Sequence, residues 1–345
     1  MSDAEPADGH AARPLWREPG LWLGIVVTVG AIAFTLRGIS LREVGSALAH
    51  ADPLWLLGVA VPANVLSLWV RGLRWKHLAS HLARITAPSA YRATAIGYLV
   101  NNLLPLRIGE IVRAWVLARE SGGGTTALFG TVLLERVIDA VVLLAIAAWV
   151  VGRRVDLGFL IALLAVPLAG IALLKWRPRL LLGAAHAVGH ALLPAGPAAR
   201  ADELLQELAD GLAGLTGVRR IAAVAGWSFV LWGVAVPLTF LGPIRALPIG
   251  LAGPAEEFFA SYLSMLYVAI AVAVPSAPGF FGVFHAACRE ALGPLGVSPD
   301  LALAMGTLAH VVFWLTYVVC GLFALRAVGT GLRDVLVWAR SGRSR

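Results

Sequence analysis

Charged residues are scarce in this sequence, and lysine is almost absent. Only 14% of the 345 residues are charged, whereas charged residues make up about a quarter of an ordinary soluble domain. Lys76 and Lys175 are the only lysines, and the mean hydropathy is +0.80. This composition excludes a soluble globular domain and predicts an integral membrane protein.

Cysteine and the short motifs of common enzyme classes are also lacking. Cys288 and Cys320 are too few for a disulfide framework or a cysteine-based metal site. The sequence has no HExxH, no GxSxG and no glycine-rich phosphate loop with a lysine. We therefore predict that the protein is not an enzyme, that it uses no metal or cofactor, and that it is not an ATP-driven pump.

Positive charge exceeds negative charge, with a formal net charge of +8 and a pI near 10.3. The basic residues lie mainly beside apolar segments, as the positive-inside rule expects of cytoplasmic loops. The sequence carries no motif of a nucleic-acid-binding module. Binding to nucleic acid is therefore not expected.

Long apolar runs are what the sequence has in abundance. A bilayer core of about 30 Å needs roughly 20 residues of helix, and runs without strict alternation favour helices over a barrel. Eight apolar segments fall near residues 21–36, 53–70, 88–106, 124–151, 157–174, 218–241, 256–274 and 301–328. The predicted fold class is an all-α polytopic membrane protein with a single transmembrane domain over 20–330. Residues 1–19 are predicted to be a disordered cytoplasmic N-terminus, and 331–345 a basic cytoplasmic tail.

The distribution of basic residues distinguishes two topologies. If all eight segments cross the membrane, the 28 lysines and arginines divide almost evenly between its two faces. If 88–123 and 256–300 are instead re-entrant hairpins, most of these residues lie on the cytoplasmic face, which the positive-inside rule favours. We therefore predict six spanning helices plus two re-entrant helical hairpins, with both termini in the cytoplasm.

The two proposed hairpins are interrupted by similar runs of proline and glycine. The first interruption lies in NNLLPLRIGE, residues 101–110, and the second in VPSAPGFFGVFH, residues 274–285. Proline supplies no backbone donor and disfavours helix in the residue before it, and broken membrane helices line interior sites. The predicted helix-break residues are Pro105, Gly109, Pro275, Pro278, Gly279 and Gly282. An inverted pseudo-repeat is predicted from the similarity of these two proline and glycine runs alone.

Two clusters of ionisable residues lie in or beside the apolar segments. The three residues of the first cluster share a helix face, as do Glu135 and Asp139 of the second. The candidate binding and gating residues are Arg107, Glu110 and Arg113 in the first cluster, and Glu135, Arg136 and Asp139 in the second. An ionised group at mid-membrane costs about 2.5–3.5 kcal/mol or more, so these side chains are expected to face the protein interior and to pair. The expected pairs join Glu135 and Asp139 to Arg107 or Arg113, and Arg136 to Glu110.

Three roles are open for these clusters. The first is a buried ion-pair network that only locks helices together. The second is a gated anion site, in which a substrate phosphate competes with a carboxylate for the same arginine. The third is proton coupling through Glu135 or Asp139. Three arginines and three acids balance, which weakens the case for a pure anion site.

Two further features bear on the fold and on titration. His285 is a candidate titrating group, although a lone histidine in a helical bundle is more often a hydrogen-bonded structural residue. Residues 201–215 place leucines on one face and acids on the other. This pattern predicts an amphipathic helix that packs on the protein or lies at the membrane surface.

The motifs NNLLPLRIGEIVRAWVLAR, LLERVIDAVVLL and PSAPGFFGVFHAA occur in this order along the chain. Together they resemble the lysylphosphatidylglycerol synthase transmembrane region, a flippase-like family, over roughly residues 20–330. In its best-known members a related domain moves aminoacylated phosphatidylglycerol to the outer leaflet and is fused to a soluble aminoacyltransferase domain. This chain stops after the membrane region, so the resemblance implies lipid translocation and not lipid synthesis. His285 stands where the third motif usually has a glutamate, which puts in doubt any mechanism that needs an acid there.

The function predicted from these observations is that of a lipid translocase in the bacterial inner membrane. It would move a phospholipid or a polyprenyl-phosphate-type amphiphile with an anionic or zwitterionic head between leaflets. The alternative is a lipid-binding accessory or scaffold subunit for a lipid- or glycan-modifying enzyme, and a membrane-embedded transferase is a third possibility. The expected partners are a membrane lipid and either an enzyme or a second copy of the chain.

Overall fold

A computed structural model describes residues 19–104, 107–151, 183, 195–212, 217–273 and 276–335. Within these ranges all regular structure is helical, so the predicted helical class is confirmed for them. Three of the described helical segments, 53–79, 218–246 and 299–328, are long and apolar enough to cross a membrane. The predicted segment 157–174 and the break residues Pro105 and Pro275 lie outside the described residues.

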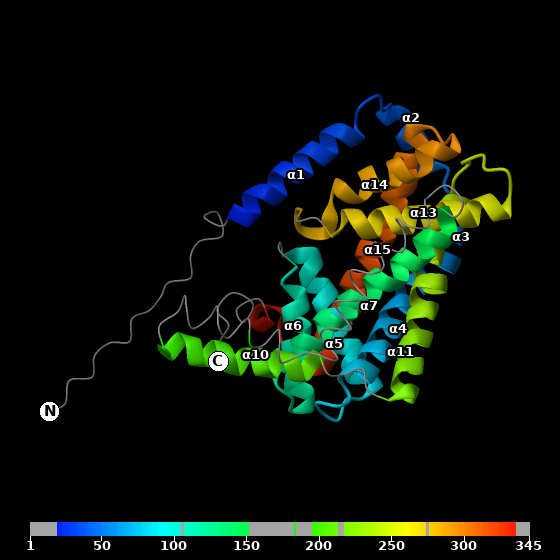
Figure 1. The fold of residues 1–345 in the computed structure, drawn as a ribbon. Coiled ribbons are helices and arrows are strands. Elements are labelled where there is room, and N and C mark those ends of the chain that lie inside the picture. Colours follow the sequence, from blue (N-terminus) through cyan, green and yellow to red (C-terminus); the bar gives the residue numbers. More distant parts are fainter. Residues whose placement is uncertain are drawn as a thin grey trace.

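Short connections join most of the described helices, and the structure describes only residue 183 between 151 and 195 (Figure 1). They are α1 (Pro19–Thr35), α2 (Leu41–Ala49), α3 (Pro53–Trp55), α4 (Val61–Ala79), α5 (Ala87–Leu103), α6 (Gly109–Ser121), α7 (Thr125–Val151), α10 (Ala195–Leu212), α11 (Val218–Val230), α12 (Val236–Ala246), α13 (Pro254–Ala271), α14 (Val283–Leu292) and α15 (Pro299–Val328). Two π-helical turns, η2 (Leu56–Ala60) and η4 (Leu231–Ala235), lead into α4 and α12. Two 3-10 turns, η5 (Pro278–Phe280) and η6 (Gly293–Leu295), flank α14.

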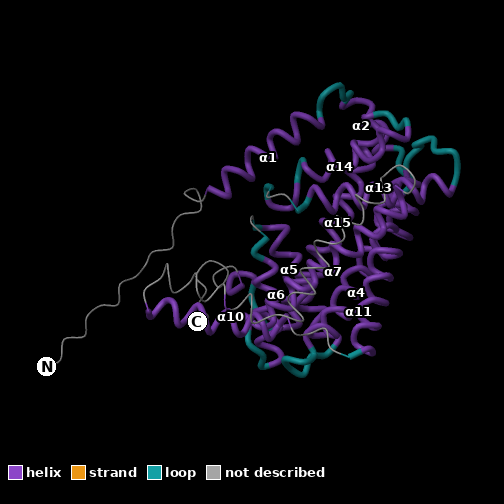
Figure 2. Tube along the Cα trace, in the orientation of Figure 1, coloured by secondary structure: helices purple, strands orange, loops and turns teal. Residues whose placement is uncertain are grey.

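Helices α4, α5, α7, α11 and α15 form a bundle, and α13 and α14 cross one end of it (Figure 1). Helix α1 lies along α14, and α10 packs on α7. The packing of α10 confirms the amphipathic helix that the sequence predicts near 201–215. The tube view follows the connections between these helices (Figure 2).

Both predicted helix breaks are present as turns between helices that pack against each other, α5 with α6 and α13 with α14. Helix α7 is long enough to span, yet it holds Glu135, Arg136 and Asp139 in its middle. The helical hairpins are therefore observed. The count of six spanning helices plus two re-entrant hairpins stays a prediction, as do the domain boundaries.

A short internal repeat accompanies the two proline- and glycine-containing helix breaks. Residues 56–62 read LLGVAVP and residues 231–237 read LWGVAVP. Each copy forms a π-helical turn directly before the α-helix that carries its proline. Both prolines therefore lie within longer helical segments, 53–79 and 218–246, where proline lacks the backbone donor of a helical hydrogen bond. Each copy is followed by a helix that breaks at the pattern Pro-x-x-x-Gly, 105–109 and 278–282.

The third residue of each Pro-x-x-x-Gly pattern has an unusual backbone. Arg107 (φ 55°) and Phe280 (φ 62°) are the non-glycine residues with positive φ in the described part of the chain, a conformation that costs an L-residue roughly 1–2 kcal/mol. The guanidinium of Arg107 lies 5.8 Å from the centroid of the Phe280 ring. The third residues of the two Pro-x-x-x-Gly patterns therefore lie close together. That the two repeat halves are inverted relative to each other stays a prediction.

Candidate functional site: a buried arginine cavity

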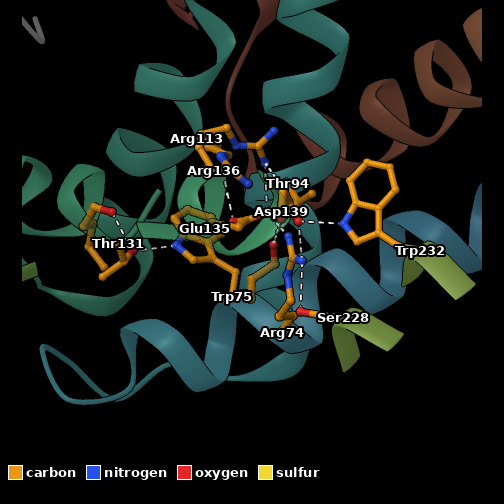
Figure 3. Close-up of polar contacts among 12 residues, drawn as sticks. Arg74, Trp75, Thr94, Arg113, Thr131, Glu135, Arg136, Asp139, Ser228 and Trp232 are labelled. Atoms are coloured by element: carbon orange, nitrogen blue, oxygen red, sulfur yellow. Dashed lines mark hydrogen bonds and ion pairs between the residues drawn. The ribbon is translucent and has the colours of Figure 1, made fainter. Parts of the chain in front are cut away.

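A fully buried arginine joins α4 to α7. The side chain of Arg74 donates from Nη2 to Glu135 Oε1 at 2.7 Å and from Nη1 to Asp139 Oδ1 at 2.5 Å (Figure 3). Its Nη1 also lies 3.2 Å from the hydroxyl oxygen of Ser228 on α11. Glu135 and Asp139 stand one turn apart on α7 and present both carboxylates to this one planar group. Because all three groups are buried, their charges require this pairing.

The remaining members of the network come from α6, α7 and η4. Arg113 Nη2 lies 3.1 Å from Glu135 Oε2, which confirms the predicted pairing of Glu135 with an arginine of the first cluster. Arg136 contacts Glu135 at 3.1 Å and Asp139 at 3.2 Å. The expected pairing of Arg136 with Glu110 was therefore wrong. Trp232 Nε1 donates to Asp139 Oδ1 at 2.7 Å and ties the second repeat segment to the network (Figure 3).

A cavity of about 450 Å³ lies directly beside this network. Four arginines line it, Arg71, Arg107, Arg113 and Arg136, together with the acids Glu110 and Asp139. Most of the lining residues that come from α12 to α15 are apolar, including Phe240, Met265, Val268, Phe280, Phe284 and Phe313. A volume of this size falls in the range of small-molecule sites. The cavity thus combines charged and apolar lining residues.

Neither Arg74 nor Arg71 was among the site residues that the sequence analysis proposed. The guanidinium of Arg71 lies 5.3 Å from the Tyr98 ring centroid and 5.1 Å from the Trp232 ring centroid, and only 7% of the residue is exposed. Within the described residues, no carboxylate lies at ion-pair distance from it. It is held by aromatic faces and turned to the cavity.

The sequence analysis did not count Arg71 and Arg74 among the interior charges. It ended the apolar segment 53–70 at the first charge, whereas α4 continues to Ala79 and buries both arginines. The missed signal is in LWVRGLRWKHLA, residues 68–79, where the apolar periodicity continues past the arginines to Trp75, Leu78 and Ala79. The expected balance of three arginines and three acids becomes five arginines and three acids.

The first helix break holds Arg107 and Glu110 at the cavity. Helix α6 begins at Gly109, and Asn101 Oδ1 accepts a hydrogen bond from the Gly109 N–H at 2.8 Å. A Cβ atom on Gly109 would lie 1.9 Å from the carbonyl oxygen of Gly97. The close approach of α5 and α6 therefore requires glycine, as the sequence predicts for the break.

The second break is built on Gly279 (φ 71°) and Gly282 (φ 82°), and Pro278 opens its 3-10 turn. A Cβ atom on Gly282 would lie 3.0 Å from the carbonyl oxygen of Thr28, and the Thr28 hydroxyl accepts from the Ala277 N–H at 2.8 Å. Helix α1 is therefore seated on this break. The predicted glycine and proline roles at these positions hold for the described residues.

The histidine next to the second break is not at the cavity. His285 is absent from the residues that line it, and its ring lies 5.0 Å from the ring of His310 on α15. The Nε2 of His310 lies 2.7 Å from the carbonyl oxygen of Gly279 and donates to it. Sequence reasoning missed His310, because an isolated histidine in an apolar helix carries no signal of its partner.

The fold and the site together define a class of protein. It is a polytopic helical membrane protein with an interior cavity whose charged residues come from α4, α6 and α7 and from a helix break. The family model described as the lysylphosphatidylglycerol synthase TM region matches residues 21–335. The chain therefore belongs to this family.

Two relatives extend the comparison. The chain is 27% identical to a protein named glycosyltransferase AglD from Haloferax volcanii over 363 residues, which cover 93% of this chain and 56% of the relative. It is 30% identical to a UPF0104 membrane protein from Methanothermobacter thermautotrophicus over 118 residues, which cover 33% of this chain and 35% of the relative. The matched regions thus span about half and about a third of these two proteins. No solved structure matches the chain.

Proposed function

We propose that the protein translocates a lipid between membrane leaflets and that the arginine cavity holds the lipid head group during transfer. The observation that carries this proposal is the surplus of arginine beside an apolar wall in one cavity. Arginine binds phosphate through charge-assisted hydrogen bonds, and the apolar wall suits the start of an acyl or prenyl chain. We further propose a bacterial inner-membrane location, with both termini in the cytoplasm.

The two helix breaks provide a route for movement in this proposal. Arg107 and Phe280 meet where the breaks touch, and both residues hold a strained backbone. Strained residues at such contacts are suited to a switch between two arrangements. A head-group phosphate would draw Arg107 from Phe280 and compete with Glu135 for Arg113, so binding and opening would be coupled.

Lipid scrambling in proteoliposomes tests this function. Fluorescent lipids are distributed over both leaflets, dithionite bleaches the outer leaflet, and the protected fraction is followed for the wild type and for Arg107→Ala. The panel contains phosphatidylglycerol, its aminoacylated form and a polyprenyl phosphate. We expect transfer of at least one lipid, and its loss in Arg107→Ala.

Arg92→Ala is the matched control, because Arg92 pairs with Glu120 on the same hairpin at 2.8 Å and does not line the cavity. Its transfer rate should equal that of the wild type. Equal transfer by wild type and Arg107→Ala would contradict the head-group role.

An accessory role for a glycan-modifying enzyme is the second candidate. It is favoured by the relative that carries the name glycosyltransferase and is almost twice the length of the matched region. In this reading the cavity presents a lipid-linked substrate to a separate enzyme. Lipid binding without transfer, from folded protein, would favour it over translocation.

A further inference from the structure

We propose that the cavity selects a head group with two negative charges on terminal phosphate, either a phosphate monoester or a diphosphate. A singly charged phosphodiester and an aminoacylated lipid of net positive charge would bind more weakly. This inference rests on the proposed lipid site and names the chemical class of its ligand. It concerns binding, so it can fail or hold independently of translocation.

Charge balance in the site carries the first part of the argument. The two carboxylates of α7, Glu135 and Asp139, balance the charges of Arg74 and Arg136, and Glu135 also contacts Arg113. The charges that remain belong to Arg71, Arg107 and Arg113 and to the single acid Glu110. Two positive charges are therefore uncompensated in a buried cavity, where a bound dianion would offset both.

Unused hydrogen-bond donors carry the second part. Arg71 and Arg113 are more than nine-tenths buried, and both line the cavity. The Nε of Arg71 and the Nε and Nη1 of Arg113 make no hydrogen bond within the described residues, whereas Nη2 of Arg113 forms the 3.1 Å ion pair with Glu135. Buried donors of this kind are normally satisfied, and the terminal oxygens of a phosphate monoester are suited to satisfy them.

The lining also argues against a cationic head group. An ammonium group in the cavity would meet four arginines and could pair only with Glu110 or with Asp139, whose two oxygens already contact Arg74, Arg136 and Trp232. Repulsion from the arginines would oppose it. The aromatic wall formed by Phe280, Phe284 and Phe313 would instead receive the apolar chain next to the phosphate.

The test compares ligands that differ by one charge on the same tail. Purified protein in detergent is titrated with farnesyl phosphate, farnesyl methyl phosphate and farnesyl diphosphate, and binding is followed by thermal shift and by microscale thermophoresis. Dioctanoyl phosphatidic acid, phosphatidylglycerol and lysylphosphatidylglycerol form a second series, which distinguishes a prenyl tail from a diacylglycerol tail. We expect the monoesters and the diphosphate to bind about tenfold more tightly than the methyl ester and phosphatidylglycerol.

Variants of Arg71 connect this preference to the cavity. Arg71→Gln should reduce monoester affinity about tenfold and abolish the preference over the methyl ester. Arg71→Lys retains the charge and should retain most of the preference, and Arg92→Gln should change nothing. If Arg71→Gln does not fold, the Arg71→Lys comparison and the wild-type ligand series still decide the question.

Equal or tighter binding of the methyl ester, of phosphatidylglycerol or of lysylphosphatidylglycerol would overturn the inference, as would no binding of any probe by folded protein. Selective binding of monoesters without transfer would leave the inference standing and remove translocation. Transfer of phosphatidylglycerol together with equal binding of phosphatidylglycerol and phosphatidic acid would overturn the inference and leave translocation standing.

Discussion

The two helix breaks of this protein share a backbone design and differ in chemistry. Each follows the pattern Pro-x-x-x-Gly, and each holds its third residue, Arg107 or Phe280, at positive φ. After the glycine the first break continues with Glu110 and Arg113, whereas the second continues with Val283 and Ala286 at the same spacing. One break therefore brings charge to the cavity, and its counterpart brings an aromatic wall.

This difference teaches that one structural element can serve two parts of one amphiphile. A lipid head group needs fixed cations, whereas its chain needs apolar surface, and the two breaks meet where head and chain would join. The charged half pairs through Arg74 and Arg113 with α7. The apolar half is held by side chains of α1 and α15, Thr28 and His310, which form hydrogen bonds with the backbone of the break. Substitutions in the two halves should therefore have distinct effects.

The largest effect on stability is expected from Arg74→Ala in the charged half. The change leaves Glu135 and Asp139 buried without their main counter-ion, and removal of one partner from a buried ion pair costs about 3–5 kcal/mol. Thermal unfolding in detergent measures the loss. Arg92→Ala removes a partly exposed ion pair and should cost under about 1 kcal/mol; equal losses for the two variants would contradict the network described for Arg74.

A smaller loss is expected from Gly109→Ala, which forces α5 and α6 apart at the first break. A Cβ atom at this position would lie 1.9 Å from the Gly97 carbonyl oxygen, and overpacking of this kind costs about 1–3 kcal/mol. Gly45→Ala is the matched control, because it lies in α2 with nothing within 4 Å of its Cβ position. The control should be neutral or slightly stabilising. A stable Gly109→Ala variant with normal lipid transfer would mean that the first break does not require the close approach of α6 to α5.

The smallest effect is expected at the second break, from His310→Phe. This change keeps a large ring and removes the donor to the Gly279 carbonyl oxygen, which should cost about 1 kcal/mol. His285→Phe makes the comparable change at a residue whose side chain makes no hydrogen bond within the described part of the chain, and it should cost less. The midpoint of thermal unfolding measures both, and a larger loss for His285→Phe would show that the polar contact of this break has been misassigned.

The sequence predicts the helical class, the positions of both breaks and the pairing of Glu135 because proline, glycine and buried charge are rare in apolar segments. Arg71 and Arg74 were not predicted, since the apolar segment 53–70 was ended at the first charge although its apolar periodicity continues to Ala79. The cost of an ionised group at mid-membrane predicts that Arg136 faces the protein interior and pairs there. It cannot choose between Glu110 and Asp139 as its partner, because that depends on the distance between helices.

The internal repeat was missed for a related reason. LLGVAVP and LWGVAVP are composed of common apolar residues, and the repeat becomes convincing only when both copies form a π-helical turn before a proline. The contact between Arg107 and Phe280 depends on the packing of helices that lie far apart in the sequence.

The central claim is that the buried arginines of the cavity hold a lipid phosphate, and native mass spectrometry of the gently extracted protein tests it most directly. The account predicts that the wild type and Arg92→Ala retain a phosphorylated lipid through purification. It predicts that Arg71→Gln and Arg107→Ala, each shown to be folded, lose that lipid. Equal retention of the same lipid by all four proteins would place lipid binding outside this cavity and contradict the account.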